Sequence, residues 1–117
     1  MNIEELDAYC LAKKGVTVST PFDHVTLVYK VMNKMFALTN IDSFKSVNLK
    51  CDPEYALELR ANHVEIQSGY HMNKKHWNTV LLNSGFDDGK IYELIDHSYN
   101  LVVSGLTKKL QKELNEM

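Results

Sequence analysis

The chain has 117 residues, a formal net charge of −2 and 44% hydrophobic residues. This composition excludes a disordered or fibrous protein, and folding at this length buries roughly two-thirds of the unfolded chain's surface, enough for one core. Its apolar runs are too short to span a membrane, and acidic residues (Glu4, Glu5 and Asp7) stand where a signal peptide would be basic, so the sequence predicts a single cytoplasmic domain over residues 1–117 without membrane association.

The chain begins with a pattern typical of a helix, expected over residues 2–14. Asn2 can cap its start, with Glu5 three positions later completing a capping box. The next stretch, "VTVSTPFD", is rich in β-branched residues but contains Pro21, which cannot donate a ladder hydrogen bond. A loop with at most a short edge strand is therefore expected there.

From His24 onward, apolar residues recur at every second position, as in a half-buried strand. Two such strands meet near Asn33, and a third, "SVNLKC", follows a short turn. Connections this short cannot make parallel crossovers, so three antiparallel strands are expected. Alternation places Lys30 and Lys50 on the face opposite the apolar residues of their strands.

The second half of the chain predicts a short helix, two strands and a long helix. Asp52 can cap the short helix. Pro53 suits the first helical position, where its missing N–H costs no hydrogen bond. The segments "VEIQSGYHM" and "WNTVLLN" are expected to be strands, and a helix follows from Asp87 or Asp88 to about Ser104. Residues 108–117 are expected to form a short helix or a frayed tail.

This order of elements predicts an α+β fold. We expect an antiparallel sheet of about five strands with the N- and C-terminal helices packed on one face. The other face would be open to solvent or to a partner.

Lysines are concentrated in the middle of the chain. Residues 24–51 and 63–82 contain six lysines against Asp42 and Glu65, whereas both ends are acidic. The small net charge argues against a protein that binds DNA through overall charge alone.

The stretch "GYHMNKKHWNTV" (69–80) combines basic, aromatic and imidazole side chains. His71 and His76 are five residues apart, which does not fit two zinc ligands on one helix face, and no spacing selects a third ligand. The sequence also lacks a serine elbow and a glycine-rich phosphate loop. No metal site, cofactor or catalytic residue is therefore predicted, and a binding protein is expected more than an enzyme.

The same stretch is suited to nucleic acid. Lys74 and Lys75 can neutralise phosphates, and Asn73 and Asn78 can reach phosphates or base edges. Tyr70, His76 or Trp77 can stack on bases or wedge into a groove. The structural alternative is that Trp77 fills a core and that "NKK" is an ordinary exposed turn.

Two further classes of function stay open. A small-molecule or enzymatic site would use a pocket around Tyr70, His71 and His76. A protein-interaction domain or a homodimer would use the sheet face without helices.

Four segments carry a resemblance to a known family. "PFDHVTLVYKVMNKMFAL" (21–38), "VNLKCDPE" (47–54), the stretch 69–80 and "LIDHSYNLVVSGL" (94–106) occur in this order. Together they resemble the MmcQ/YjbR family of small bacterial proteins. The resemblance implies a frataxin-like α+β fold, with a curved antiparallel sheet and terminal helices, and a proposed "double wing" that binds DNA.

The resemblance also implies the residues of the wings. This chain has Met32 and Asn33 where the family tends to have Gly-Gly, so the backbone of the first wing is expected to differ. His71 belongs to the family's signature stretch. The leading prediction is a non-enzymatic DNA-binding or regulatory protein that grips the phosphate backbone of duplex DNA. Its expected contacts are Lys34, Lys50, Asn73, Lys74, Lys75, His76 and Trp77.

Overall fold

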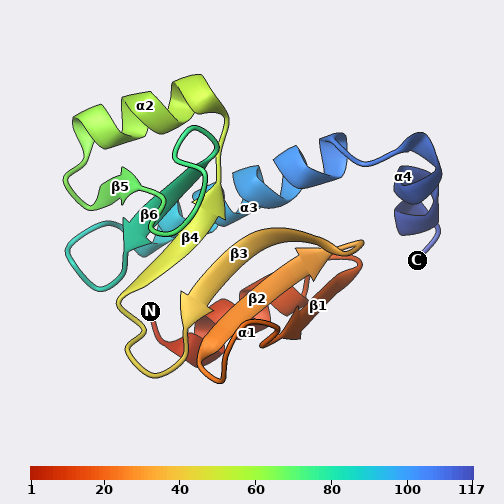
Figure 1. The fold of residues 1–117 in the computed structure, drawn as a ribbon, viewed down its shortest axis with the longest axis horizontal. Helices are drawn as coiled ribbons and strands as arrows, with labels where there is room; N and C mark the ends of the chain where they lie inside the picture. Colours follow the sequence, from red (N-terminus) through yellow and green to blue (C-terminus); the bar gives the residue numbers. More distant parts are fainter.

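The computed structural model describes all 117 residues, which form four helices and one six-stranded sheet (Figure 1). The helices are α1 (Ile3–Leu11), α2 (Pro53–Asn62), α3 (Asp88–Ser104) and α4 (Lys108–Asn115). The strands are β1 (Val16–Ser19), β2 (Thr26–Val31), β3 (Lys34–Asn40), β4 (Ser46–Lys50), β5 (Ile66–Ser68) and β6 (Trp77–Leu81). The predicted α+β class is confirmed, with six strands where about five were expected.

The sheet is antiparallel throughout, with the strand order β1-β2-β3-β4-β6-β5. The additional strand is β1, which pairs with β2 from Val16 to Ser19. Pro21 lies beyond its end, so the proline does not interrupt the ladder. The stretch after Pro21 is a loop, as the sequence indicated.

The prediction of a strand across "VEIQSGYHM" was wrong in its second half. β5 ends at Ser68, and residues 69–76 leave the sheet as a loop. His71 has a φ of 58°, in the left-handed region that a strand does not use. The chain therefore turns away from the ladder after Gly69, whose N–H still bonds to the carbonyl of Trp77 at 2.9 Å.

The predicted helix starts are confirmed by their caps. The Asn2 side chain accepts from the Glu5 N–H at 2.8 Å, and the Glu5 carboxylate accepts from the Asn2 N–H at 3.1 Å. Asp52 and Asp87 cap α2 and α3, with Pro53 in the first turn of α2. α1 ends at Leu11, earlier than expected, whereas the C-terminal segment forms the helix α4.

The main core lies between the sheet and the helices α1 and α3, which both pack behind it in the view of Figure 1. α2 joins this core through Ala56 and Leu59. The apolar side chains that α1 and α3 bury are Leu6, Cys10, Ile91, Leu94, Ile95 and Val102. The terminal helices thus cover one face of the sheet, as predicted. None of the four helices combines the length and the hydropathy that a membrane span requires.

The hairpin between β2 and β3 has a two-residue turn in which both residues have positive φ, 48° at Met32 and 67° at Asn33. This is the geometry of a type I′ turn, whose twist matches the flanking strands. The turn near Asn33 is therefore confirmed. Close to this turn, the pairing of β2 with β3 shifts register between Tyr29 and Lys30. The shift indicates a bulge in which Phe36 is the extra residue of β3.

Candidate ligand-binding groove

The sheet face without helices carries a second apolar cluster. Val28, Leu38 and Trp77 are buried there, and Met35 and Met72 pack against them. Trp77 is only 8% exposed although no helix covers it. The loop 69–76 supplies Met72, so part of the face that was expected to be open is covered by this loop.

Three residues hold the loop against the sheet through a closed ring of hydrogen bonds. The Thr79 hydroxyl donates to Asn48 Oδ1 at 2.6 Å, and Asn48 Nδ2 donates to the carbonyl of Tyr70 at 3.2 Å. The Tyr70 N–H donates back to Thr79 Oγ1 at 2.9 Å. Because Asn48 lies on β4 and Thr79 on β6, the ring fixes the loop across two strands.

The side chains of Tyr70 and His71, at this end of the loop, are exposed to solvent. Tyr70 is 69% exposed, and its ring lies 4.0 Å from the imidazole of His71, centroid to centroid. Arg60 of α2 holds the other end by donating to the carbonyl of Lys74 at 3.1 Å.

A groove of about 630 Å³ runs over this face. Its floor consists of apolar side chains from β3 and the loop: Met35, Leu38 and Met72. One side is formed by the segment before and at the start of β2: Phe22, Asp23 and Thr26. The other side carries Tyr70 and His71, and the remaining lining is polar: Thr39, Asn40, Ser46 and Asn48. The volume lies within the range of small-molecule sites.

The bulge of the first hairpin contributes to the floor. Tyr29 pairs with Ala37 and Lys30 with Met35, so Phe36 has no partner on β2. A bulge places an extra residue in one strand and reverses the alternation beyond it. Met35 and Ala37 therefore face opposite sides, and Met35 reaches the groove while Ala37 joins the main core.

Asp23 is the one carboxylate of the groove lining. It accepts from the N–H of Val25 at 2.9 Å and from the N–H of Thr26 at 2.6 Å, and the Thr26 hydroxyl donates to it at 2.9 Å. These hydrogen bonds hold the pKa of Asp23 below its usual range. The groove thus has a fixed negative charge at its Phe22 side.

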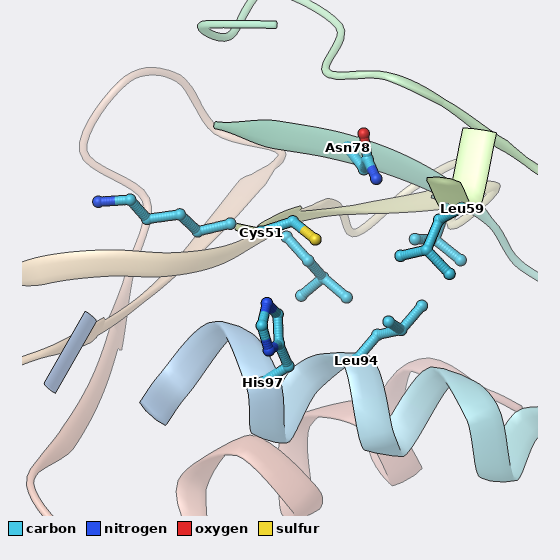
Figure 2. Close-up of a pocket in the computed structure, with 8 residues that line it drawn as sticks. Cys51, Leu59, Asn78, Leu94 and His97 are labelled. Atoms are coloured by element: carbon cyan, nitrogen blue, oxygen red, sulfur yellow. The ribbon is translucent and has the colours of Figure 1, made fainter. Parts of the chain in front are cut away.

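A second, much smaller pocket lies between α2, α3 and the strands β4 and β6 (Figure 2). Cys51, Asn78 and His97 point toward it, yet its volume is only about 10 Å³. Space of this size holds at most about one water molecule. His97 Nε2 accepts from the N–H of Asp52 at 3.2 Å, so this histidine helps to fix the start of α2.

Comparison with known proteins places the chain in a family. The family model described as YjbR matches residues 11–101. The chain belongs to the YjbR family. It is 36% identical to the uncharacterized protein YjbR of Escherichia coli strain K12 over 118 aligned residues, covering 100% of both chains. It is also 37% identical over 75 residues to the uncharacterized protein YyaQ of Bacillus subtilis strain 168, covering 64% of this chain and 63% of that protein.

Solved structures of similar proteins have the same fold. The crystal structure of Deinococcus radiodurans protein DR2400, with family-model domain DUF419, is 40% identical and superposes with a TM-score of 0.90, covering 97% of this chain and 88% of that one. A crystal structure of a Pseudomonas syringae protein is 30% identical with a TM-score of 0.72, covering 86% of this chain and 98% of that one. The resemblance to the YjbR family is therefore confirmed over the fold as a whole.

In this YjbR-family chain, two of the three predicted pocket residues line the groove. Tyr70 and His71 do so, whereas His76 is absent from the lining. The carbonyl of His76 accepts from the N–H of Cys51 at 2.8 Å, which places its backbone beside the end of β4. The three residues thus divide between the two ends of the loop.

The predicted nucleic-acid contacts are dispersed. Lys50 shares a face with Trp77, its partner on β6, but Lys34 pairs with Val31, whose buried side chain belongs to the helix-covered core. Paired residues of adjacent strands face the same side. Lys34 and Lys50 therefore lie on opposite faces.

The loop uses some of these side chains for its own structure. Asn73 Oδ1 accepts from the N–H groups of Lys75 at 2.9 Å and His76 at 3.3 Å. Lys74 Nζ donates to the carbonyl of Gly69 at 2.9 Å. Trp77 is buried, whereas Lys75 is exposed and its ammonium group makes no hydrogen bond or ion pair within the protein.

None of the lysines in the middle of the chain is paired with a carboxylate. The ion pairs join Lys13 to Asp96 and the N-terminal ammonium to Asp88. These six lysines without a carboxylate partner are Lys30, Lys34, Lys45, Lys50, Lys74 and Lys75.

Most groove residues were not predicted as a site. Phe22 and Asp23 stand in the segment 21–38 that carries the family resemblance, but the sequence does not show that they face the sheet. Strand alternation does place Asn48 on the helix-free face. Met35 has no sequence signal, because the bulge that redirects it does not appear in the apolar pattern.

Proposed function

We propose that this YjbR-family chain is a small-molecule-binding protein whose site is the groove on the helix-free face of the sheet. The observation that carries this proposal is the position of two aromatic side chains. Phe22 is 65% exposed and Tyr70 is 69% exposed, and they flank an apolar floor. Large exposed hydrophobic side chains around a concave apolar surface are typical of a binding site.

The construction of the groove supports the same function. The ring of hydrogen bonds between Asn48, Tyr70 and Thr79 fixes one wall before any ligand arrives, which lowers the entropic cost of binding. Met35 and Met72 on the floor are flexible and polarisable, so they can adapt to the shape of a ligand. A rigid wall and an adaptable floor favour binding of a small organic molecule.

A titration of the ¹⁵N-labelled protein with a library of small aromatic compounds tests this function. We expect the amide signals of Leu38, Asn48 and Tyr70 to move together, because these residues share the groove. The emission of Trp77, the only tryptophan, should change as well, since it packs in the cluster that forms the floor.

Variants complete the test. The double change Phe22→Ala with Tyr70→Ala should weaken binding about tenfold, because two aromatic contacts are lost. Leu57→Ala is the matched control, since Leu57 is 63% exposed on α2 outside the groove. Equal weakening by both variants, or shifts spread over the whole surface, would contradict the proposal.

Duplex DNA is a second candidate partner. It is supported by the six lysines in the middle of the chain that have no carboxylate partner, and by the position of Lys30 and Lys50 on the helix-free face. It ranks second because Lys34 lies on the other face and Trp77 is buried. The salt dependence of the affinity for duplex DNA tests this candidate.

A further inference from the structure

The charge of the groove is unlike that of the surrounding face. Asp23 contributes a carboxylate to the lining, and no lysine or arginine lines the groove. Lys30 and Lys50 belong to the same sheet face, but neither is part of the lining. A ligand lying on the floor therefore meets the negative charge of Asp23 and no lysine or arginine side chain.

Hydrogen bonds within the protein hold the carboxylate of Asp23 in place. Its hydrogen bonds to Val25 and Thr26 orient it, and the residue itself is solvent-exposed, so its remaining lone pairs can accept from a ligand. Phe22 is the residue before Asp23 in the chain and lines the same side of the groove, whereas Tyr70 lines the other side. Carboxylates and aromatic faces both attract cations, whereas they repel anions.

We infer that the groove binds a small organic cation with a flat apolar body. This inference rests on the proposed function and names the ligand class of that site. The apolar body lies on Met35 and Leu38 between the two aromatic side chains, and the ammonium group is directed to Asp23. Thr39, Asn40 and Ser46 supply further polar groups around the ligand.

The inference excludes a phosphate-bearing ligand from this groove. Anion sites in proteins are formed by arginine, lysine or clustered backbone N–H groups. Lys30 and Lys50, on the helix-free face of the sheet, lie outside the groove lining. The N–H groups of Val25 and Thr26 already donate to the carboxylate of Asp23. Binding to DNA phosphates, if it occurs, would therefore use a different part of the surface.

Three probes with the same ring and different charge test the inference: naphthylmethylammonium, naphthylmethanol and naphthoate. Each is titrated into the ¹⁵N-labelled full chain, and dissociation constants are read from the groove amides. The cation should bind about fivefold more tightly than the alcohol, and naphthoate should bind most weakly. High salt should reduce the preference for the cation, since screening weakens exposed charge pairs.

The variant Asp23→Asn keeps a side-chain oxygen for Val25 and Thr26 but removes the charge. It should bring the affinity for the cation to that for the alcohol and leave the alcohol unchanged. Asp42→Asn is the control, because Asp42 is an exposed carboxylate outside the lining and should change neither affinity.

The outcomes separate the two claims. If all three probes bind in the groove equally well, or the preference survives in Asp23→Asn, the site stands and the charge inference is overturned. If no probe shifts the groove amides at millimolar concentration, both the site and its ligand class are overturned. If Asp23→Asn does not fold, an unchanged cation preference of the wild-type chain at high salt would overturn the inference.

Discussion

The Ser98 hydroxyl donates a hydrogen bond to the carbonyl of Phe36 at 2.6 Å, in the interior of the protein. The same hydroxyl accepts from the N–H of Lys50 at 2.9 Å. The ladder between β3 and β4 ends at the pair Ala37 and Leu49, so the side chain from α3 satisfies the backbone groups where the strands separate. One serine thus joins the long helix to both central strands.

Replacing this serine should destabilise the fold. Ser98→Ala leaves the buried carbonyl of Phe36 and the part-buried N–H of Lys50 without this partner, which costs about 2–4 kcal/mol in the free energy of unfolding. Ser104→Ala, at an exposed serine whose hydroxyl bonds only within α3, should cost less than about 0.5 kcal/mol. Urea denaturation measures both values, and equal effects would show that the hydroxyl of Ser98 does not bridge the strands.

The hydrogen-bond ring at the groove should control ligand binding. Thr79→Val has nearly the same shape but cannot bond to Asn48 or Tyr70. We expect faster amide exchange at Tyr70 and about threefold weaker binding of groove ligands, because the wall loses its fixed position. Thr17→Val on the exposed side of β1 is the control. Unchanged exchange at Tyr70 would refute a role of the ring in holding the loop.

The two cysteines should be inert in the folded protein. Burial raises the pKa of the Cys51 thiol to about 11 and that of the Cys10 thiol to about 12. A disulfide reagent at a pH near 8 should therefore react with them at least about a hundredfold faster in guanidinium than in the native state. An introduced thiol, Ser84→Cys in an exposed loop, should react quickly in both states.

The same shifts predict how stability depends on pH. A thiol whose pKa is higher in the folded state stabilises the fold fully below its unfolded pKa of about 8.5, and this stabilisation is lost as the pH rises toward about 11 to 12. The unfolding midpoint should therefore fall over this range in the wild type. A variant with Cys10→Ala and Cys51→Ala should show a smaller decline, and an equal decline would assign it to other groups.

Duplex DNA binding predicts a characteristic response to salt. The plot of log affinity against log salt should be linear, and Lys74→Ala with Lys75→Ala should flatten its slope by about two units, because two phosphate contacts are removed. The matched control is Lys108→Ala with Lys109→Ala on α4, which changes the net charge equally. Absence of binding at low salt, or the same slope change in both double variants, rules out the loop as the DNA contact.

The sequence by itself determined the α+β class, the starts of the helices and the face of several strand residues. Caps such as Asn2 with Glu5, and Asp52 before Pro53, act over a few residues and can be read locally. Period-two alternation likewise placed Lys50 opposite the apolar side chains of β4, and the structure shows Lys50 paired with Trp77 on that face.

Only the tertiary structure decided the candidate site. The groove depends on hydrogen bonds from Asn48 to Tyr70 and from Thr79 to Asn48, which are 22 and 31 residues apart in the chain. These contacts fold the loop 69–76 over the sheet and help to bury Trp77, whereas the bulge turns Met35 into the groove. Local sequence patterns report neighbouring residues along one element, so they carry no signal for contacts that form when separate elements pack together.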